Sequence, residues 1–482
     1  MKKFILIFLV LVMPLFGCTM TPKYARPEFP SAPKWDDIPG YQTEAGQQAA
    51  KKLQWRAFFR DEQLRDVINT ALENNRDLRL AALNIKEARA LYRITRANVM
   101  PSVRGTGKGS YQNTSKANTL SGYTSDSDRY DANVGVTSYE LDLFGRLRSE
   151  NQAALNEYFA TRAAKDVVRN SLIAETANAY LQFLADEKLV ALSEETLDTQ
   201  KRTHDLLSQS MQKGVATEQD VARARTALET AQVNLHRYRR LVEQDRNALI
   251  LLMGVPHQEG LIPDADLAKI NLSSLPVAMP SEVLLGRPDI RQAEFRLMAR
   301  NADIGAARAA FFPDISLTGA YGFASRRLSD LFSGDALGQW SFVPELTAPI
   351  FTGGRGTANL DLAKIRKDKA VVQYEQVIRT AFREVSDDLA ARATLTQELG
   401  AQLRLVDAAQ RVYNNSEARY KAGVDSFLSV LDAQRGLYAA RQGVIEIRRQ
   451  RLSNLINLYK ALGGDTGDDP ASAASDPDPQ TP

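Results

Sequence analysis

The sequence predicts a mainly α-helical chain with a membrane β-barrel, built from two tandem repeats. Three observations indicate this class. Residues 62–254 and 281–463 follow one pattern at an offset of 209 to 212 positions, which is the sign of an internal duplication. Each copy has two segments of about ten residues with alternating hydropathy, typical of outer-membrane strands. Each copy also has about 65 residues without proline, enough for a helix of about 100 Å.

The register of the two copies is clearest in their second halves. Gly214 lies 40 residues before Gly254, and Gly423 lies 40 residues before Gly463. Between these glycines, apolar residues pair at one constant offset: Val215/Val424, Val221/Val430, Ala224/Ala433, Leu228/Leu437 and Ala231/Ala440. Agreement over this length indicates duplication rather than chance.

Composition excludes several classes of function. The 482 residues carry 61 basic and 58 acidic side chains, a formal charge of +3, so no basic field attracts nucleic acid. One cysteine excludes disulfides within the chain and a thiolate metal cage. The three histidines are far apart in sequence and form no ligand pair. We therefore expect no cofactor, no metal site and no enzymatic activity.

The N-terminus predicts export with a lipid anchor. Residues 1–17 have a basic start and an apolar run of about ten residues, too short to span a membrane, as in a signal peptide. Gly17 before Cys18 resembles a lipobox, although Phe16 departs from the small residue usual at that position. The alternative is an ordinary signal peptide with an incidental cysteine. Residues 18–60 contain five spaced prolines and predict an extended leader with little packing of its own.

Within each repeat a helix is followed by two strands. Residues 62–98 have helical periodicity, and strands are expected at about 103–112 and 133–143 around a polar loop. The second repeat is expected to have strands at about 314–324 and 340–350. Its two apolar stripes match in spacing: Ile315, Leu317, Gly319, Tyr321 and Phe323, then Trp340, Phe342, Pro344, Leu346, Ala348 and Ile350. The alternative is a soluble hairpin packed on helices.

No stretch of 18 residues after Met20 lacks charge, so a transmembrane helix is not expected. A chain that still crosses a membrane must do so as a closed barrel. Four strands are too few for a barrel, whereas three chains supply twelve. We therefore predict a homotrimer whose twelve-stranded barrel continues as a twelve-helix tube.

Long helices are predicted at 148–212 and 357–422, and the second carries apolar residues at seven-residue spacing, which favours coiled-coil packing. Gly214 and Gly423 are placed to end these helices with positive φ. Thr217 with Asp220 resembles a capping box, and Asp425 is expected to be the N-cap of the second return helix. Residues 255–280 form a linker between the repeats, and the acidic tail 464–482 is expected to be disordered.

Several motifs in this order resemble the TolC family, and more narrowly its lipoprotein branch of outer-membrane factors for drug efflux. The motifs are Trp55-x-x-Phe58-Phe59-x-Asp61, Asn75-Arg76-Asp77-Leu78, Tyr139-Glu140-Leu141-Asp142-Leu143-Phe144-Gly145-Arg146, Gly286-Arg287-Pro288-Asp289-Ile290, Tyr420-x-Ala422-Gly423-Val424 and Val430-Leu431-Asp432-Ala433-Gln434. The match covers nearly all of the chain after Cys18.

The resemblance implies a passive outer-membrane duct, anchored by lipid and by its barrel, with a long periplasmic extension. Its partners would be two further copies, a periplasmic adaptor protein and an inner-membrane pump, commonly of the resistance-nodulation-division class. The pump would supply the energy.

The resemblance also implies a gate at the periplasmic tip. Asp432 matches the family's constriction carboxylate, and Ser429 stands where a second Asp is common. Asp220 and Tyr420 match a closed-state hydrogen-bonding pair, whereas Asp425 stands where some relatives have a basic residue. The adaptor would contact the two exposed turns: Lys213, Gly214 and Val215, with Ala422, Gly423 and Val424.

Three other functions stay open. An outlet for type I protein secretion has the same fold, but Cys18 argues against it. A metal-efflux outlet gains little support from eight methionines and three histidines. A periplasmic coiled-coil scaffold without a pore would require all four strand segments to be soluble.

Overall fold

The structure is a computed structural model that describes residues 19–28, 54–114, 125–257, 260, 262–263, 265–275, 281–331 and 337–464. The expected signal peptide, the lipidation site Cys18 and the tail from 465 lie outside these residues. The chain divides into two compact units. Unit 1 comprises residues 1–28, 84–161 and 293–374, and unit 2 comprises residues 29–83, 162–292 and 375–482.

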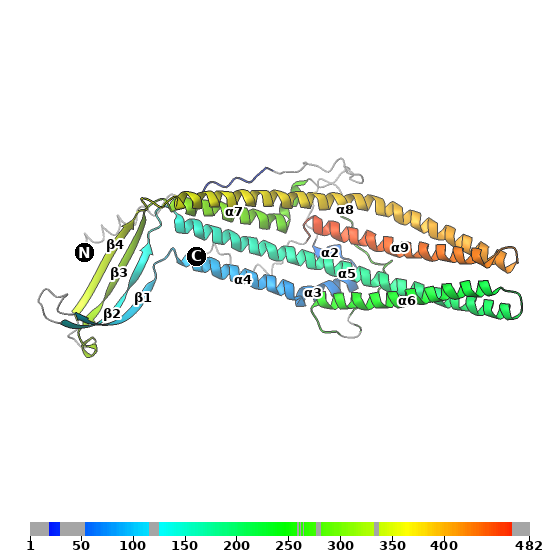
Figure 1. The fold of residues 1–482 in the computed structure, drawn as a ribbon. Coiled ribbons are helices and arrows are strands. Elements are labelled where there is room, and N and C mark those ends of the chain that lie inside the picture. The colour runs from blue at the N-terminus through cyan, green and yellow to red at the C-terminus, as the bar shows by residue number, and fades with distance from the viewer. Residues whose placement is uncertain are drawn as a thin grey trace. The chain divides into compact units, whose positions relative to one another are not determined.

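Unit 1 contains a four-stranded antiparallel sheet in the order β1-β2-β3-β4 (Figure 1). The strands are β1 (Val103–Thr114), β2 (Ser125–Glu140), β3 (Asp314–Ser325) and β4 (Leu337–Thr347). Each repeat thus supplies one hairpin, and β2 pairs with β3 to join the two hairpins.

The apolar stripe expected in the second repeat is confirmed. Tyr321 lies opposite Trp340, and Gly319 lies opposite Phe342. Directly opposed residues share one face of a sheet, and these three aromatic side chains are exposed on it. β4 ends at Thr347, earlier than the expected residue 350, because its partner β3 begins at Asp314 opposite that residue.

The polar segment before residue 132 is part of β2, so the expected start of this strand near residue 133 was too late. Ser125 pairs with Thr114, and the ladder with β1 continues without a shift to Val136. The Tyr130 and Tyr111 hydroxyls are 2.8 Å apart across this ladder. Pairing with a neighbouring strand therefore outweighs the polar composition from which a loop was expected.

The leader is better packed than its prolines indicated. In unit 1 the Arg26 guanidinium donates to both oxygens of the buried Glu294 carboxylate, at 2.6 and 2.9 Å. Asn301 Nδ2 donates to the backbone oxygen of Pro22 at 2.8 Å. In unit 2 the short helix α2 (Trp55–Phe58) buries the Phe58 ring in a stack on Tyr459. The expectation of little packing was therefore wrong for both described parts of the leader.

The helix expected over 62–98 is interrupted at Asn75. α3 (Glu62–Asn74) ends there and α4 (Arg76–Ala97) begins directly afterwards. The Asn75 side-chain oxygen accepts from the backbone N–H groups of Asp77 and Leu78, and its Nδ2 donates to the Leu252 carbonyl at 2.9 Å. Asn75 has extended backbone angles, so it caps both helices and breaks the run.

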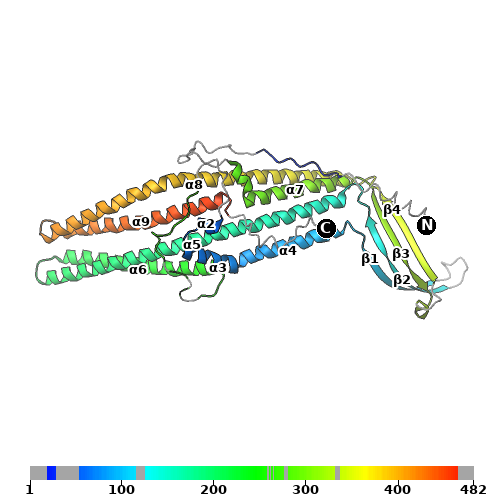
Figure 2. The same cartoon turned by 180° about the vertical axis from the view of Figure 1, so that it is seen from behind.

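Four long helices follow the strands. α5 (Arg146–Gln212) and α8 (Arg355–Lys421) have 67 residues each, which agrees with the expected long helices. Within unit 2, α5 returns as α6 (Glu218–Met253) and α8 returns as α9 (Phe427–Ala461), and both views show each pair running side by side to a shared turn (Figures 1 and 2). η2 (Ser281–Gly286) and α7 (Pro288–Ala309) precede β3, and η3 (Leu328–Asp330) follows it.

None of the helices formed by the described residues has both the length and the apolar character needed to cross a membrane.

Candidate functional site at the hairpin tips

Both helical hairpins turn through a glycine with positive φ, as expected from the sequence. Gly214 has φ 75° and Gly423 has φ 72°. In the first turn Val215 N–H donates to Ser210 O at 2.9 Å, and in the second Val424 N–H donates to Arg419 O at 3.0 Å. These bonds satisfy carbonyl groups at the helix ends. The two tips are therefore the same turn built twice.

The side chains beyond the glycines are exposed. Val215 has 81% of its surface accessible and Val424 has 64%. Beyond each glycine and its two chain neighbours, no atom of the described residues lies within 4 Å of the position that a Cβ would occupy at Gly214 or Gly423. The turns thus present two small apolar surfaces that nothing in the described chain covers.

The two return helices begin differently. The capping box expected for α6 is confirmed: Thr217 Oγ1 accepts from Asp220 N–H at 3.2 Å, and Asp220 Oδ2 accepts from Thr217 N–H at 3.3 Å. The expected N-cap Asp425 was wrong, because Ser426 occupies that position in α9.

Asp425 instead forms a local polar cluster. Its carboxylate accepts from Arg419 Nε at 3.2 Å, from Ser426 N–H at 3.0 Å and from Ser429 Oγ at 3.1 Å. The bond from Arg419 is the main reason that the pKa of Asp425 is lowered. Asp432 lies further along α9, 64% exposed, with Arg435 Nη1 at 3.8 Å. Ser429 and Asp425 are thus in contact, whereas the Asp432 carboxylate points to solvent and to its own helix.

An apolar cluster packs beneath both turns. It consists of Leu207, Ala224, Phe427, Val430 and Leu431 and is called the tip cluster here. Tyr420 lies on its edge with its ring 5.5 Å from that of Phe427. Burial, and then the charge of Asp220, raises the pKa of Tyr420. Tyr420 and Val221, the residue after Asp220, both pack against the tip cluster, so Asp220 and Tyr420 lie near one another. No hydrogen bond joins them in the part of the chain described.

Sequence reasoning missed part of this cluster. Val430 and Leu431 lie in a quoted motif, but Leu207 and Phe427 had no assigned role. The available signal was an apolar residue directly after the turn, Phe427, together with Leu207, which lies about two helical turns before Gly214. The cluster draws on α5, α6 and α9, so packing ties the first hairpin to the second near the tips.

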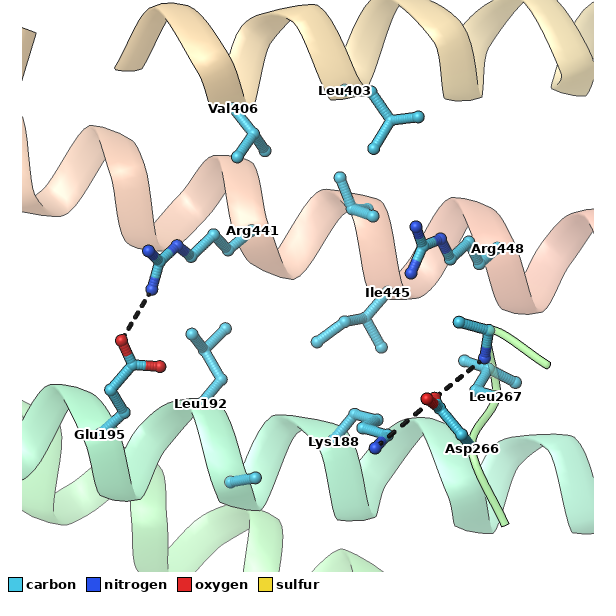
Figure 3. Close-up of a pocket in the computed structure, with 13 residues that line it drawn as sticks. Lys188, Leu192, Glu195, Asp266, Leu267, Leu403, Val406, Arg441, Ile445 and Arg448 are labelled. Carbon is cyan, nitrogen blue, oxygen red and sulfur yellow. Dashed lines mark hydrogen bonds and ion pairs between the residues drawn. The ribbon is translucent and has the colours of Figure 1, made fainter. Parts of the chain in front are cut away.

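Further from the tips, a cleft of about 500 Å³ lies between α5, α8, α9 and the linker (Figure 3). Arg441 Nη1 pairs with Glu195 at 3.0 Å across one end, and Lys188 Nζ pairs with Asp266 at 3.5 Å across the other. Between these ion pairs the lining is mostly apolar. Ion pairs that bridge separate elements align the helices but supply no nucleophile with a base beside it.

A metal site is also not found in the described ranges. They contain no group of three or more His, Cys, Asp or Glu side chains that could hold a metal ion. The residues that are brought together at the tips are turn formers, caps and apolar side chains. Such an arrangement can bind another protein or change its packing.

Comparison with known proteins identifies the family of this chain. The family model described as outer membrane efflux protein matches residues 67–255 and 279–464. The chain is 46% identical over 465 residues to the probable efflux pump outer membrane protein TtgC of Pseudomonas putida, covering 96% of each chain. It is 41% identical to the outer membrane protein OprJ of Pseudomonas aeruginosa, covering 95% of each.

Among solved structures, the open state of the Neisseria gonorrhoeae MtrE outer membrane channel matches with a TM-score of 0.83 and 39% identity. The match covers 93% of this chain and 98% of that one. The two halves of the family match correspond to the two repeats of the sequence. The chain therefore belongs to the outer membrane efflux protein family.

Proposed function

We propose that this chain is the outer-membrane channel of a tripartite efflux pump and passively conducts drugs and other small toxic compounds to the exterior. The observation that carries the proposal is the combination in one chain of strand hairpins with an exposed aromatic face and two helical hairpins of matched length. Membership of the efflux family supports it. The family consists of channels, and we infer that this chain has no enzymatic activity.

The test has two parts. Purified protein in a planar bilayer is expected to give discrete conductance steps, and a scaffold without a pore would give none. Deletion of the gene is expected to raise susceptibility to drugs and detergents. Susceptibility confined to metals, or loss of a secreted protein with unchanged drug susceptibility, would favour the alternative outlets for metal or for type I secretion.

The channel is proposed to be a homotrimer. β1 and β4 are the outer strands of the described sheet, and long open edges normally find a partner. Pairing of β4 with β1 of the next copy would close twelve strands from three chains. Native mass spectrometry of the detergent-extracted protein is expected to find three chains, and a monomer or dimer would contradict the closure.

The tips are proposed to contact a periplasmic adaptor, which links the channel to an inner-membrane pump, expected to be of the resistance-nodulation-division class. Val215 and Val424 are the exposed apolar residues of the two turns, beside Lys213, Gly214, Ala422 and Gly423. Val215→Arg with Val424→Arg is expected to abolish efflux while trimers persist. Val233→Arg is the matched control, because Val233 is similarly exposed on α6 away from the turn. Retained drug resistance in the double variant would refute this contact.

The gate is proposed to be closed by contacts at the same tips. Asp220 and Tyr420 are neighbours there, Asp425 and Ser429 are bonded, and Asp432 contributes a carboxylate to the constriction. Asp220→Ala with Tyr420→Phe is expected to raise the single-channel conductance.

Thr217→Val tests whether the conductance depends on the contact between Asp220 and Tyr420, called the latch, or on the helix cap at Thr217. This change removes the Thr217 half of the capping box and leaves the Asp220 carboxylate in place. An equal rise in conductance in Thr217→Val would assign the effect to the turn instead of the latch. Unchanged conductance in the Asp220 and Tyr420 variant would refute the latch.

The lipid anchor is proposed at Cys18, one residue before the described part of the leader begins. Burial of acyl methylenes would then add to membrane attachment. Mass spectrometry of the N-terminal peptide is expected to find an acylated cysteine, and a free thiol or a different N-terminus would contradict the assignment.

A further inference from the structure

A second cavity, of about 480 Å³, lies between α5, α6, α8 and α9 in unit 2. Its lining residues are nearer to the turns along each helix than those of the cleft in Figure 3. The ion pair between Glu195 and Arg441 lines both cavities and so stands between them. Sites for small molecules commonly measure about 300–1,000 Å³, so this cavity is large enough for an organic ligand.

Gln200 gives the cavity an unused hydrogen-bond acceptor. This residue of α5 lines the cavity and is only 6% exposed. Its Nε2 donates to Gln434 Oε1 on α9 at 3.1 Å, whereas its own Oε1 is buried and has no hydrogen-bond partner among the described residues. A buried amide oxygen that accepts no hydrogen bond is costly, so a ligand that brings a donor to it is favoured.

The hydroxyl groups around the cavity donate elsewhere. Thr196, Thr199 and Thr230 each donate to a carbonyl of their own helix, at 2.7, 2.9 and 2.7 Å. The Tyr438 hydroxyl is 3.0 Å from Ser193 Oγ. A threonine oxygen that donates its proton still has lone pairs. A molecule in the cavity therefore meets acceptors, which an O–H or N–H group of its own would satisfy.

The remaining lining favours an uncharged ligand with an apolar body. Arg441 Nη1 lies 3.0 Å from Glu195, and Arg435 Nη1 lies 3.8 Å from Asp432, so each charged residue of the lining already has a counter-charge. A charged ligand would have to compete with these ion pairs. Three helices contribute buried apolar side chains to the wall: Leu192, Ala231 and Leu437.

The cavity borders the tip cluster. Ala227 on α6 and Tyr413 on α8 line the cavity, and both also pack against the tip cluster. Gln434, the partner of Gln200, has its Nε2 3.5 Å from the Tyr413 hydroxyl. A molecule in the cavity would therefore rest against side chains that support both turns.

We propose that this cavity binds an uncharged molecule with an apolar body and one O–H or N–H donor, such as a phenol, and that its occupation strengthens the packing beneath both tips. The ligand's donor bonds to Gln200 Oε1, and its apolar body contacts the side chains of α5, α6 and α9. The site is built from one chain, so it does not depend on the proposed channel function.

Fluorescence titration of the full-length protein with 2-naphthol tests the site, and 2-methoxynaphthalene is the matched compound without a donor. The parent is expected to bind 2-naphthol saturably and about tenfold more tightly than 2-methoxynaphthalene, because a hydrogen bond to a buried acceptor has about that effect. In Gln200→Leu this preference is expected to vanish while both compounds still bind. Equal affinities in the parent, or a preference that survives in Gln200→Leu, would overturn the proposal.

Ala231→Phe is designed to fill the cavity and is expected to abolish saturable binding of both compounds. Ala191→Phe is the matched control, because Ala191 lines the cleft on the other side of the ion pair between Glu195 and Arg441. Absence of saturable binding in the parent, unchanged binding in Ala231→Phe, or an equal loss in Ala191→Phe would each overturn the location. If Ala231→Phe folds poorly, the preference measured in Gln200→Leu still decides the question.

Hydrogen–deuterium exchange reports the effect on the tips. With 2-naphthol at about ten times its Kd, exchange of residues 207–216 and 420–430 in the parent is expected to slow by up to about tenfold, since opening of the tips must release the ligand. The same addition is expected to leave Ala231→Phe unchanged. Unaltered exchange of the parent at saturating 2-naphthol would overturn the link between the cavity and the tips.

Discussion

Arg287 holds the end of α9, and its removal is expected to open that end locally. The side chain is 6% exposed. Its Nη1 donates to the Ala461 carbonyl at 2.6 Å, and its other nitrogens donate to Asp289 at 3.0 and 2.7 Å and to Glu384 at 2.8 Å. These contacts tie the start of α7, the middle of α8 and the last turn of α9 to one guanidinium.

The expected cost of removing the Arg287 side chain follows from the hydrogen bond that each of its partners loses. The Asp289 and Glu384 side chains are 30% and 42% exposed, so water can replace the guanidinium at both carboxylates. Ala461 is buried, and its carbonyl would be left without a donor. An unsatisfied buried acceptor costs about 1–3 kcal/mol, which corresponds to roughly 5- to 150-fold faster exchange of the amides that open with it.

The assay is hydrogen–deuterium exchange of residues 458–464 in Arg287→Ala and Arg287→Lys. The lysine variant is expected to lie between the parent and Arg287→Ala, because one ammonium group cannot reproduce the fork geometry of arginine. Arg291→Ala is the control, since Arg291 is exposed on α7, four residues after Arg287. Exchange in Arg287→Ala within twofold of the parent would refute the reasoning, as would an equal effect of Arg291→Ala.

Two further predictions concern close contacts of the backbone and of the leader. Gly254→Ala is expected to destabilise the chain more than Gly214→Ala. Both glycines have positive φ, which costs about 1–2 kcal/mol for alanine. Of the two, only Gly254 would place the new Cβ 2.5 Å from a backbone oxygen, that of Asn74. Local exchange rates measure the difference, and equal effects would contradict the clash. Arg26→Glu is expected to release residues 20–26 from α7, detected as faster proteolysis, and Glu294→Arg in the same chain is expected to restore protection. Protection that is unchanged in the single variant would show that the ion pair does not hold the leader.

Local sequence signals predicted the elements that depend on neighbouring residues. Proline-free stretches predicted α5 and α8 to within two residues at each end. Gly214 and Gly423 were recognised because a helix that reverses direction needs a residue that accepts positive φ. The same is true of the capping box at Thr217, where both partners lie within four residues.

Sequence signals gave wrong predictions where another bond, distant or local, competes with the preference of the segment. Asn75 interrupts a helix because its side chain also bonds to Leu252, 177 residues away. The polar start of β2 is a strand because β1 offers it a complete ladder. Asp425 is not the N-cap, since Arg419 and Ser429 hold its carboxylate beside the helix start. Sequence spacing alone does not contain these competing bonds.

The sequence by itself determined the duplication, the alternation of strands and long helices, and the turns at both tips, because periodicity and backbone preference are properties of short segments. Only the tertiary structure decided which polar side chains meet. It brings Arg26 to Glu294, Arg287 to Ala461 and Arg441 to Glu195. Each of these contacts joins residues more than 50 positions apart, and burial of a charge or a carbonyl gains its energetic weight only when the fold removes water from around it.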